Sequence, residues 1–149
     1  MKLILSIIIV LSFLVPSVGT AGGEIDLYDL KGKALVYIDP FDESAIYTWR
    51  GDAVAYLVGE CGSSCTFIYT WEGSHIGFFA NGIVFDLQGD IVGTTQGVMD
   101  YTYYPPEPKH AKGEKYPKND RYAPAVKEPN FSYTPSKWSL EDFMTQDNS

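Results

Sequence analysis

The stretch IYTWRGDAVAYL, residues 46–57, recurs in three further variants, and the four copies align without gaps. Each copy has glycine at its sixth position, and these glycines (Gly32, Gly51, Gly73 and Gly89) follow one another at 19, 22 and 16 residues. The spacings are too short for a strand-helix-strand unit of about 30 residues and fit one β-hairpin plus a linker. The other copies are LYDLKGKALVYI (27–38), IYTWEGSHIGFF (68–79) and VFDLQGDIVGTT (84–95).

The glycine of each copy predicts the turn of its hairpin. A two-residue connection needs positive φ, which glycine adopts without steric cost, so each x-Gly pair is expected to close a hairpin. The aromatic residue four positions before the glycine then faces the aliphatic residue three positions after it. The predicted cross-strand pairs are Tyr28 with Leu35, Tyr47 with Val54, Tyr69 with Ile76 and Phe85 with Val92.

The hairpins carry apolar residues on both faces, which predicts how they assemble. A single hairpin is marginal in water, so the four units are expected to bury one another. A closed pseudo-four-fold ring over residues 22–100 does this and also covers the exposed strand edges. The fold class is therefore all-β, with an open β-solenoid as the alternative architecture.

The four repeats, the opening YDLKGKALVYID (28–39) and the ending WSLEDF (138–143) resemble the bacterial four-fold β-flower family. The resemblance covers residues 25–96 and, more loosely, the tail. It implies a ring of four pseudo-symmetric hairpins and a bacterial origin, and it implies no activity and no catalytic residues. The chain departs from the pattern by its CGSSC insertion and by Thr94-Thr95 at the end of the fourth unit, which leaves the completeness of the last strand open.

Residues 1–21 have the pattern of an export signal. Lys2 precedes an apolar run of 13 residues, Pro16 ends the run, and Gly19-Thr20-Ala21 supplies small residues before a cleavage site. The alternative is an uncleaved anchor, but 13 residues are fewer than the roughly 20 that span a bilayer. We expect cleavage after Ala21, a secreted or periplasmic mature chain and no membrane span in it.

Cys61 and Cys65 lie in the sequence CGSSC and are expected to form a disulfide in an oxidising compartment. The alternative is a redox-active pair. The thioredoxin-type signature has two intervening residues in a βαβ context, whereas three residues separate these cysteines on a predicted loop.

The charge distribution divides the chain. Its 149 residues have a formal net charge of −8, and residues 22–100 contain 12 acidic and three basic side chains. Such a chain is not expected to bind nucleic acid, because phosphate neutralisation needs Lys and Arg. Residues 101–137 contain seven Pro, seven Lys or Arg and four acids, which predicts an extended linker. This stretch is expected either to be a mobile linker or to wrap the acidic ring, using its basic residues and Tyr101, Tyr103, Tyr104, Tyr116, Tyr122 and Tyr133.

Residues 138–149 are predicted to form a short amphipathic docking segment. Ser139 and Asp142 have capping-box spacing, and Leu140, Phe143 and Met144 follow a helical spacing beside Trp138. This apolar segment is expected to dock through Trp138, Leu140 and Phe143. We expect the segment to dock on the ring of its own chain. The alternatives are that it docks on a neighbouring copy or on a partner protein.

The residues favour binding over catalysis. His75 stands where other repeats have Ala34, Ala53 and Ile91, which marks a candidate site, but such a residue is more often a half-buried strand histidine. No catalytic residue, cofactor or metal site is predicted, because the aspartate pairs Asp26 with Asp29 and Asp86 with Asp90 do not complete a calcium cage.

Trp49 and Trp71 occupy the same repeat position and form, with His75, the predicted ligand-binding set. The alternative is that the two tryptophans are simply the largest residues of the core. Paired aromatic side chains near polar groups suit sugars or peptides. The sequence thus predicts a non-enzymatic binding module of the bacterial envelope, with a cell-wall glycan or an envelope protein as partner. The alternatives are a small extracytoplasmic hydrolase using His75 with an acidic partner, and a structural subunit joined to another chain by its C-terminal segment. The oligomeric state stays open.

Overall fold

A computed structural model describes residues 23–62, 64–121 and 129–146, so the predicted signal peptide and Tyr122 lie outside the described residues. The described chain forms eight strands and one short helix. The elements are β1 (Ile25–Tyr28), β2 (Ala34–Asp39), β3 (Ala45–Thr48), β4 (Ala53–Val58), β5 (Cys65–Thr70), β6 (His75–Ala80), β7 (Ile83–Asp86), β8 (Ile91–Thr94) and α1 (Leu140–Met144).

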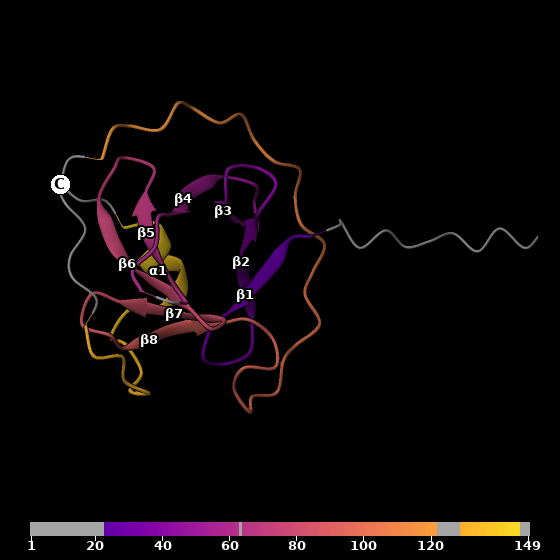
Figure 1. The fold of residues 1–149 in the computed structure, drawn as a ribbon. Coiled ribbons are helices and arrows are strands. Elements are labelled where there is room, and N and C mark those ends of the chain that lie inside the picture. Colours follow the sequence, from indigo (N-terminus) through magenta and orange to yellow (C-terminus); the bar gives the residue numbers. More distant parts are fainter. Residues whose placement is uncertain (1–22, 63, 122–128, 147–149) are drawn as a thin grey trace, which may run out of the picture.

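The strands form a closed antiparallel barrel in which neighbours follow chain order. Figure 1 shows the strands arranged around the centre of the ring. Each repeat is one hairpin, and Tyr28 of β1 pairs with Thr94 of β8 to close the ring. This confirms the predicted ring and excludes the open solenoid. Thr94, which left the last strand in doubt, is fully buried at the closure.

The turns are one residue longer than predicted. In the first hairpin the Asp29 amide donates to the Lys33 carbonyl, and the Gly32 amide donates to the Asp29 carbonyl, which encloses a three-residue loop. Gly32 has a φ of 83°, the left-handed conformation that such a loop needs at its last residue. Asp29 also accepts the amides of Lys31 and Lys33 through Oδ1, at 2.9 Å each. The aspartate before the glycine thus caps its own turn, as Asx-type bonding predicts.

The predicted cross-strand pairs are wrong by one residue, because every hairpin contains a β-bulge next to its turn. Leu27 pairs with Val36, but Tyr28 pairs with Ala34, so Leu35 is the extra residue. The Leu35 carbonyl instead accepts the Trp49 amide of the next hairpin at 3.2 Å. The observed pairs at this position are Tyr28 with Ala34, Tyr47 with Ala53, Tyr69 with His75 and Phe85 with Ile91.

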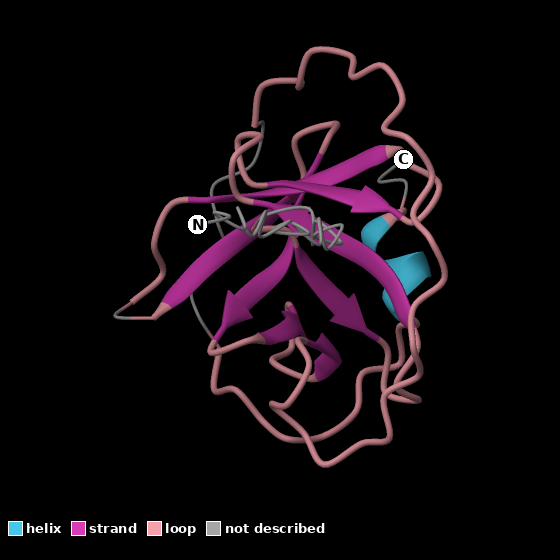
Figure 2. Cartoon of the chain, turned by 90° about the vertical axis from the view of Figure 1, so that its right-hand side faces the viewer, coloured by secondary structure: helices cyan, strands magenta, loops and turns pink. Residues whose placement is uncertain are grey.

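The helix α1 fills the inside of the ring near one end, where Figure 2 shows it beside the strand ends. Ser139 caps it by accepting the Asp142 amide at 3.1 Å. Its apolar side chains join the core inside the barrel, which the strands build from Leu27, Val36, Ile38, Ile46, Ala55, Ile68, Ile76, Val84 and Val92. Gly77 and Gly93 leave room for the helix, because a Cβ at Gly77 would lie 2.7 Å from the Phe143 ring.

The described residues between the ring and the helix run around the outside of the barrel (Figure 1). We call residues 101–121 and 129–136 the strap. The strap crosses all four hairpin turns, and at each turn glycine one strap carbonyl occupies the space that a Cβ would need. These carbonyls belong to Thr102, Ala111, Asp120 and Asn130. The wrapping alternative, and not the mobile linker, therefore describes these residues.

Candidate functional site

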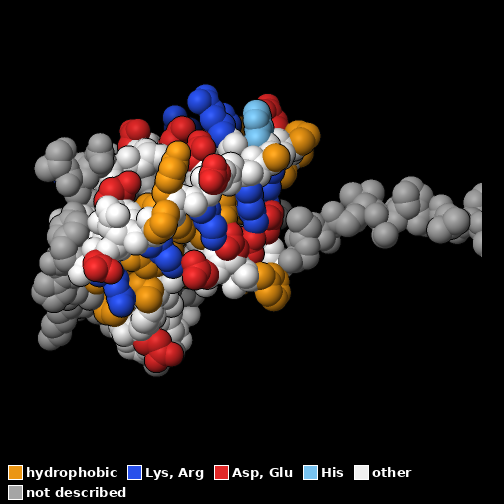
Figure 3. All heavy atoms as spheres, turned by 90° about the horizontal axis from the view of Figure 1, so that it is seen from above, with side chains coloured by type: hydrophobic (Ala, Val, Ile, Leu, Met, Phe, Trp, Pro, Cys, Tyr) orange, Lys and Arg blue, Asp and Glu red, His pale blue; other side chains and the backbone are white. Residues whose placement is uncertain are grey.

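An ionic seam joins the strap to the acidic side of the ring. Strap lysines at every third position reach acidic side chains of the first hairpin and of the segments just before and after it, and Figure 3 shows the resulting alternation of basic and acidic groups. An extended chain with three residues per turn, the geometry that proline favours, brings every third side chain to one side. The pairs are Lys109 with Glu24 and Asp26, Lys112 with Glu24 and Asp39, Lys115 with Asp42, and Lys118 with Glu43.

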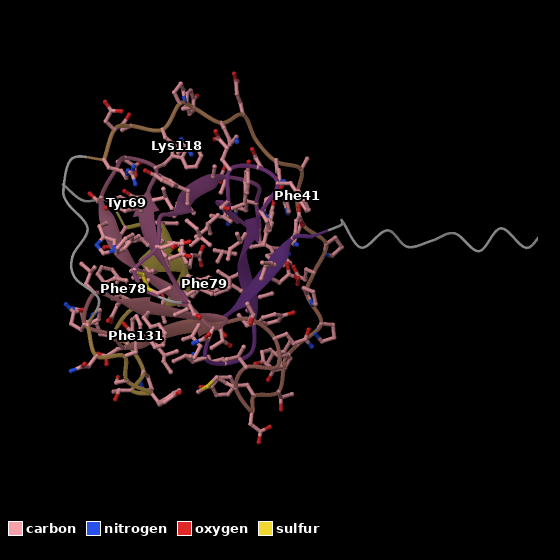
Figure 4. All side chains as sticks on the ribbon, viewed as in Figure 1. Phe41, Tyr69, Phe78, Phe79, Lys118 and Phe131 are labelled. Atoms are coloured by element: carbon pink, nitrogen blue, oxygen red, sulfur yellow. A yellow bond between two sulfur atoms is a disulfide. The ribbon has the colours of Figure 1, made fainter. Side chains whose placement is uncertain are left out.

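The same lysines lie over aromatic rings on the outer face of the barrel. Lys109 Nζ lies 4.2 Å from the centre of the Tyr37 ring, and Lys118 Nζ lies 4.5 Å from that of Tyr56. Further along the strap, Phe131 stacks on Phe85 with ring centres 4.3 Å apart. Phe131 also contacts Phe78, and Figure 4 labels both of these rings. The strap thus covers the outer aromatic face of the ring. Its own tyrosines contribute less, since Tyr104, Tyr116 and Tyr133 are exposed.

The ion pairs shift the pKa values of the groups that form them. A hydrogen bond from Lys112 lowers the pKa of Asp39, and hydrogen bonds from Lys115 and Tyr47 lower that of Asp42. Burial, together with the bond to Asp42, raises the pKa of the Tyr47 hydroxyl. Both carboxylates are therefore held in the charged form that binds the strap.

A cleft of about 680 Å³ opens where the strap bridges the turns of the first two hairpins. We call it the strap cleft. Lys31 and Lys33 come from the first turn, Trp49 and Arg50 come from the second, and strap residues 104–108 and 110 form the bridge. Glu141 of α1 also lines it. The cleft combines an indole, three prolines and charged groups of both signs.

Trp49 and Trp71 have equivalent positions but different surroundings. Trp49 Nε1 donates to the Glu107 carbonyl at 2.8 Å, and Trp71 Nε1 donates to the Tyr116 carbonyl at 2.7 Å. Both indoles are half-buried and hold the strap. Of the two tryptophans, only Trp49 lines the strap cleft, so they do not form a common binding site there.

His75, the third residue of the predicted set, lies apart from both tryptophans in an aromatic cluster. It is 8% exposed and lies among Phe67, Tyr69 and Phe78, the last two of which Figure 4 labels. Its Nε2 lies 2.9 Å from the Gly77 carbonyl oxygen. Burial lowers the pKa of His75, opposed in part by that contact. His75 lines neither the strap cleft nor the smaller cleft beside Glu72, so its surroundings are those of a core histidine.

Cys61, in the loop between β4 and β5, and Cys65, the first residue of β5, are joined by a disulfide, as predicted. Their Cα atoms are 5.0 Å apart, within the usual range for such a bond. Both cysteines pack in the same cluster as Phe78 and Phe85. The bond closes the short loop that precedes the third hairpin, and neither cysteine lines the strap cleft.

The C-terminal segment docks on its own ring. Leu140 and Phe143 are fully buried, and Trp138 is half-buried against the same core. One alternative was that this segment joins another chain. Its apolar side chains are instead buried against the ring of its own chain.

The aspartates considered as calcium ligands have other contacts. Asp26 pairs with Lys109, Asp29 and Asp86 cap turns, and Asp90 accepts the Ser132 hydroxyl at 2.9 Å. Within residues 23–62, 64–121 and 129–146 no group of three or more His, Cys, Asp or Glu is arranged to hold a metal ion. In these same ranges no helix is long and apolar enough to cross a bilayer.

The ring, the strap and the inserted helix define a class of small all-β protein with pseudo-four-fold symmetry. The chain belongs to the four-fold β-flower family, whose sequence model, described as 4-fold beta flower protein, matches residues 25–145. The match includes the strap and α1 as well as the hairpins. No curated protein and no solved structure shows significant similarity to the chain.

Two features of the site were not predicted from the sequence. The lysines at 109, 112, 115 and 118 repeat every third residue, and this period in a proline-rich stretch was a signal for a one-sided contact. The clustering of Lys31, Lys33 and Arg50 was harder to predict from the sequence. These residues come from two different turns, which lie side by side only once the ring has formed.

Proposed function

We propose that this protein is a non-enzymatic binding module that acts outside the cytoplasm and takes its ligand in the strap cleft. The main support for the proposal is the cleft itself, which is lined by the Trp49 indole and by the proline-rich residues of the strap. Its volume of about 680 Å³ falls within the range of about 300–1,000 Å³ typical of ligand sites. An indole near polar groups suits the apolar face and the hydroxyl groups of a sugar.

The walls of the cleft are held in place before any ligand binds. Asp29 caps the first turn, and the Thr48 hydroxyl accepts the Asp52 amide at 3.2 Å in the second. The bridge is fixed by the Trp49 indole and by the Tyr104 amide, which donates to the Gly32 carbonyl at 2.9 Å. Such preorganisation lowers the entropic cost of binding and favours a recognition role.

Export of the chain is part of the proposal. The signal-like residues 1–21 and the Cys61–Cys65 disulfide support a periplasmic or secreted location. In a bacterial envelope, a cleft with an indole and polar groups is suited to a cell-wall glycan. The buried position of His75 supports binding over hydrolysis, because a general base needs access to its substrate.

Co-sedimentation of the mature protein with purified cell-wall sacculi tests the proposal. The decisive comparison is Trp49→Ala against Trp71→Ala, because both variants lose one indole bond to the strap and only Trp49 lines the cleft. We expect pelleting that persists in salt, falls in Trp49→Ala and is retained in Trp71→Ala. Absence of pelleting, or equal loss in both variants, would count against a glycan site at this cleft.

A further inference from the structure

The basic residues of the hairpin domain gather in one place. Residues 22–100 contain three bases, Lys31, Lys33 and Arg50, against 12 acids, and all three bases line the strap cleft. The ion pairs found among the described residues involve strap lysines, and none involves these three. Three exposed cations thus stand together in an otherwise acidic domain without a neutralising contact within the described chain.

The acidic residues of the cleft have other positions and roles. Asp29 Oδ1 accepts two amides of its own turn. Glu107 comes from the strap and Glu141 from α1, whereas the bases come from the two hairpin turns. Apart from Asp29, which lies on the first turn, the cleft is therefore divided, with cations on the turns and carboxylates on the strap and helix. Carboxylates accept hydrogen bonds from hydroxyl and amide groups, which sugars supply.

Comparison of the four repeats shows that the fold does not require these bases. The position before the turn glycine holds Lys31, Arg50, Glu72 or Gln88. All four turns have the same backbone hydrogen bonds, so an acidic or neutral side chain serves the turn equally well. The smaller cleft near the third turn, of about 110 Å³, is lined by Glu72. Positive charge is thus a property of one cleft and not of the repeat.

We infer that the strap cleft recognises an acidic glycan, with a carboxylate or phosphate group bound by Lys31, Lys33 and Arg50 and a sugar ring against Trp49. This inference rests on the proposed function and adds the charge of its ligand. Arg and Lys form charge-assisted hydrogen bonds to both kinds of anionic group, and the planar guanidinium of Arg50 can bind two oxygens at once.

The test uses ligands that differ only in charge. Soluble disaccharide-peptides released from sacculi carry free carboxylates, and carbodiimide coupling to ammonia converts these to neutral amides. Binding of both forms to the mature protein is measured by calorimetry at constant ionic strength, and polyglycerol phosphate is the phosphate-bearing probe. We expect the carboxylate form to bind about tenfold more tightly than its amide, a change equivalent to one charge-assisted hydrogen bond.

Arg50→Gln and Lys31→Gln are the test variants, and Lys137→Gln is the control, because it removes an exposed base outside the cleft. We expect each test variant to weaken binding of the acidic probe by about tenfold, and the control by less than about twofold. If polyglycerol phosphate is the probe that binds and Arg50→Gln weakens it, the inference holds with phosphate as the anion.

Two results would overturn the inference. Equal binding of the acidic and amidated fragments, with the Trp49→Ala loss retained, would leave a glycan site that does not read charge. Failure of every probe to bind, acidic or neutral, would remove both the inference and the proposed function.

Discussion

The indole N–H of Trp49 donates a 2.8 Å hydrogen bond to the main-chain carbonyl of Glu107, 58 residues further along the chain. Trp71 makes the same bond, at 2.7 Å, to Tyr116, nine residues beyond Glu107. The strap carbonyls that approach the turn glycines, at residues 102, 111, 120 and 130, follow a similar step. The strap therefore repeats its contacts in phase with the hairpins, which makes it a structural part of the ring.

The ionic seam predicts how the strap responds to loss of one lysine. Lys112→Gln removes the contacts with Asp39 and Glu24. Since partly exposed ion pairs contribute up to about 1 kcal/mol, we expect a small loss of global stability. Amide exchange at Gly113, whose N–H donates to the Gly51 carbonyl, should be faster. Lys137→Gln is the control, and equal exchange rates at Gly113 in both variants would show that the seam does not hold the strap.

The buried helix predicts a large cost for truncating its apolar side chains. Leu140 is fully buried in the ring, so Leu140→Ala should lower the free energy of unfolding by about 2–5 kcal/mol. Glu141→Ala, on the exposed side of the same helix, should change it by less than about 0.5 kcal/mol. Urea unfolding measures both values. A loss for Leu140→Ala as small as that of the control would mean that the helix is not docked in solution.

The glycines that face the helix predict a steric effect. A Cβ at Gly77 would lie 2.1 Å from the Phe85 carbonyl oxygen and 2.7 Å from the Phe143 ring. Gly77→Ala should therefore destabilise the ring by about 1–3 kcal/mol or more, the usual cost of overpacking. The matched change Gly113→Ala meets no atom closer than 3.6 Å and should be tolerated. Thermal unfolding compares the two, and equal melting temperatures would contradict the close approach at Gly77.

The buried histidine predicts acid sensitivity above the range in which carboxylates titrate. Because burial lowers the pKa of His75, the unfolded chain binds more protons than the folded chain between that lowered pKa and about 6.5. The free energy of unfolding should therefore fall as the pH decreases below about 6.5. His75→Ala, which introduces the residue found at positions 34 and 53, should reduce this dependence.

Urea unfolding at several pH values between about 5 and 7.5 measures the effect of His75, in a window above the ordinary pKa of carboxylates. His110→Ala, which removes the exposed histidine, is the control and should keep the acid sensitivity of the parent chain. A pH dependence that survives in His75→Ala would assign it to another group.

The sequence was sufficient to predict the ring, because the turn glycines and the apolar residues repeat in the same order four times. It did not predict the register, because Leu35 and Ala34 are both suitable partners for Tyr28 by residue type. The bulge is accompanied by a long-range contact, the bond from the Trp49 amide to Leu35. The sequence also did not predict that the strap contacts each turn in the same way. Main-chain carbonyls make the contacts with the turn glycines, and because every residue has a carbonyl, these contacts leave no pattern of residue types.

Two equivalent indoles hold the strap, and we predict that only one of them, Trp49, contacts the ligand. The Nε1–H resonances of Trp49 and Trp71 in a ¹⁵N-labelled mature protein test it during titration with soluble wall disaccharide-peptides. We predict that the Trp49 resonance shifts in a saturable way and that the Trp71 resonance does not move. Equal shifts of both indoles, or no shift of Trp49 at saturating ligand, would contradict a ligand site in the strap cleft.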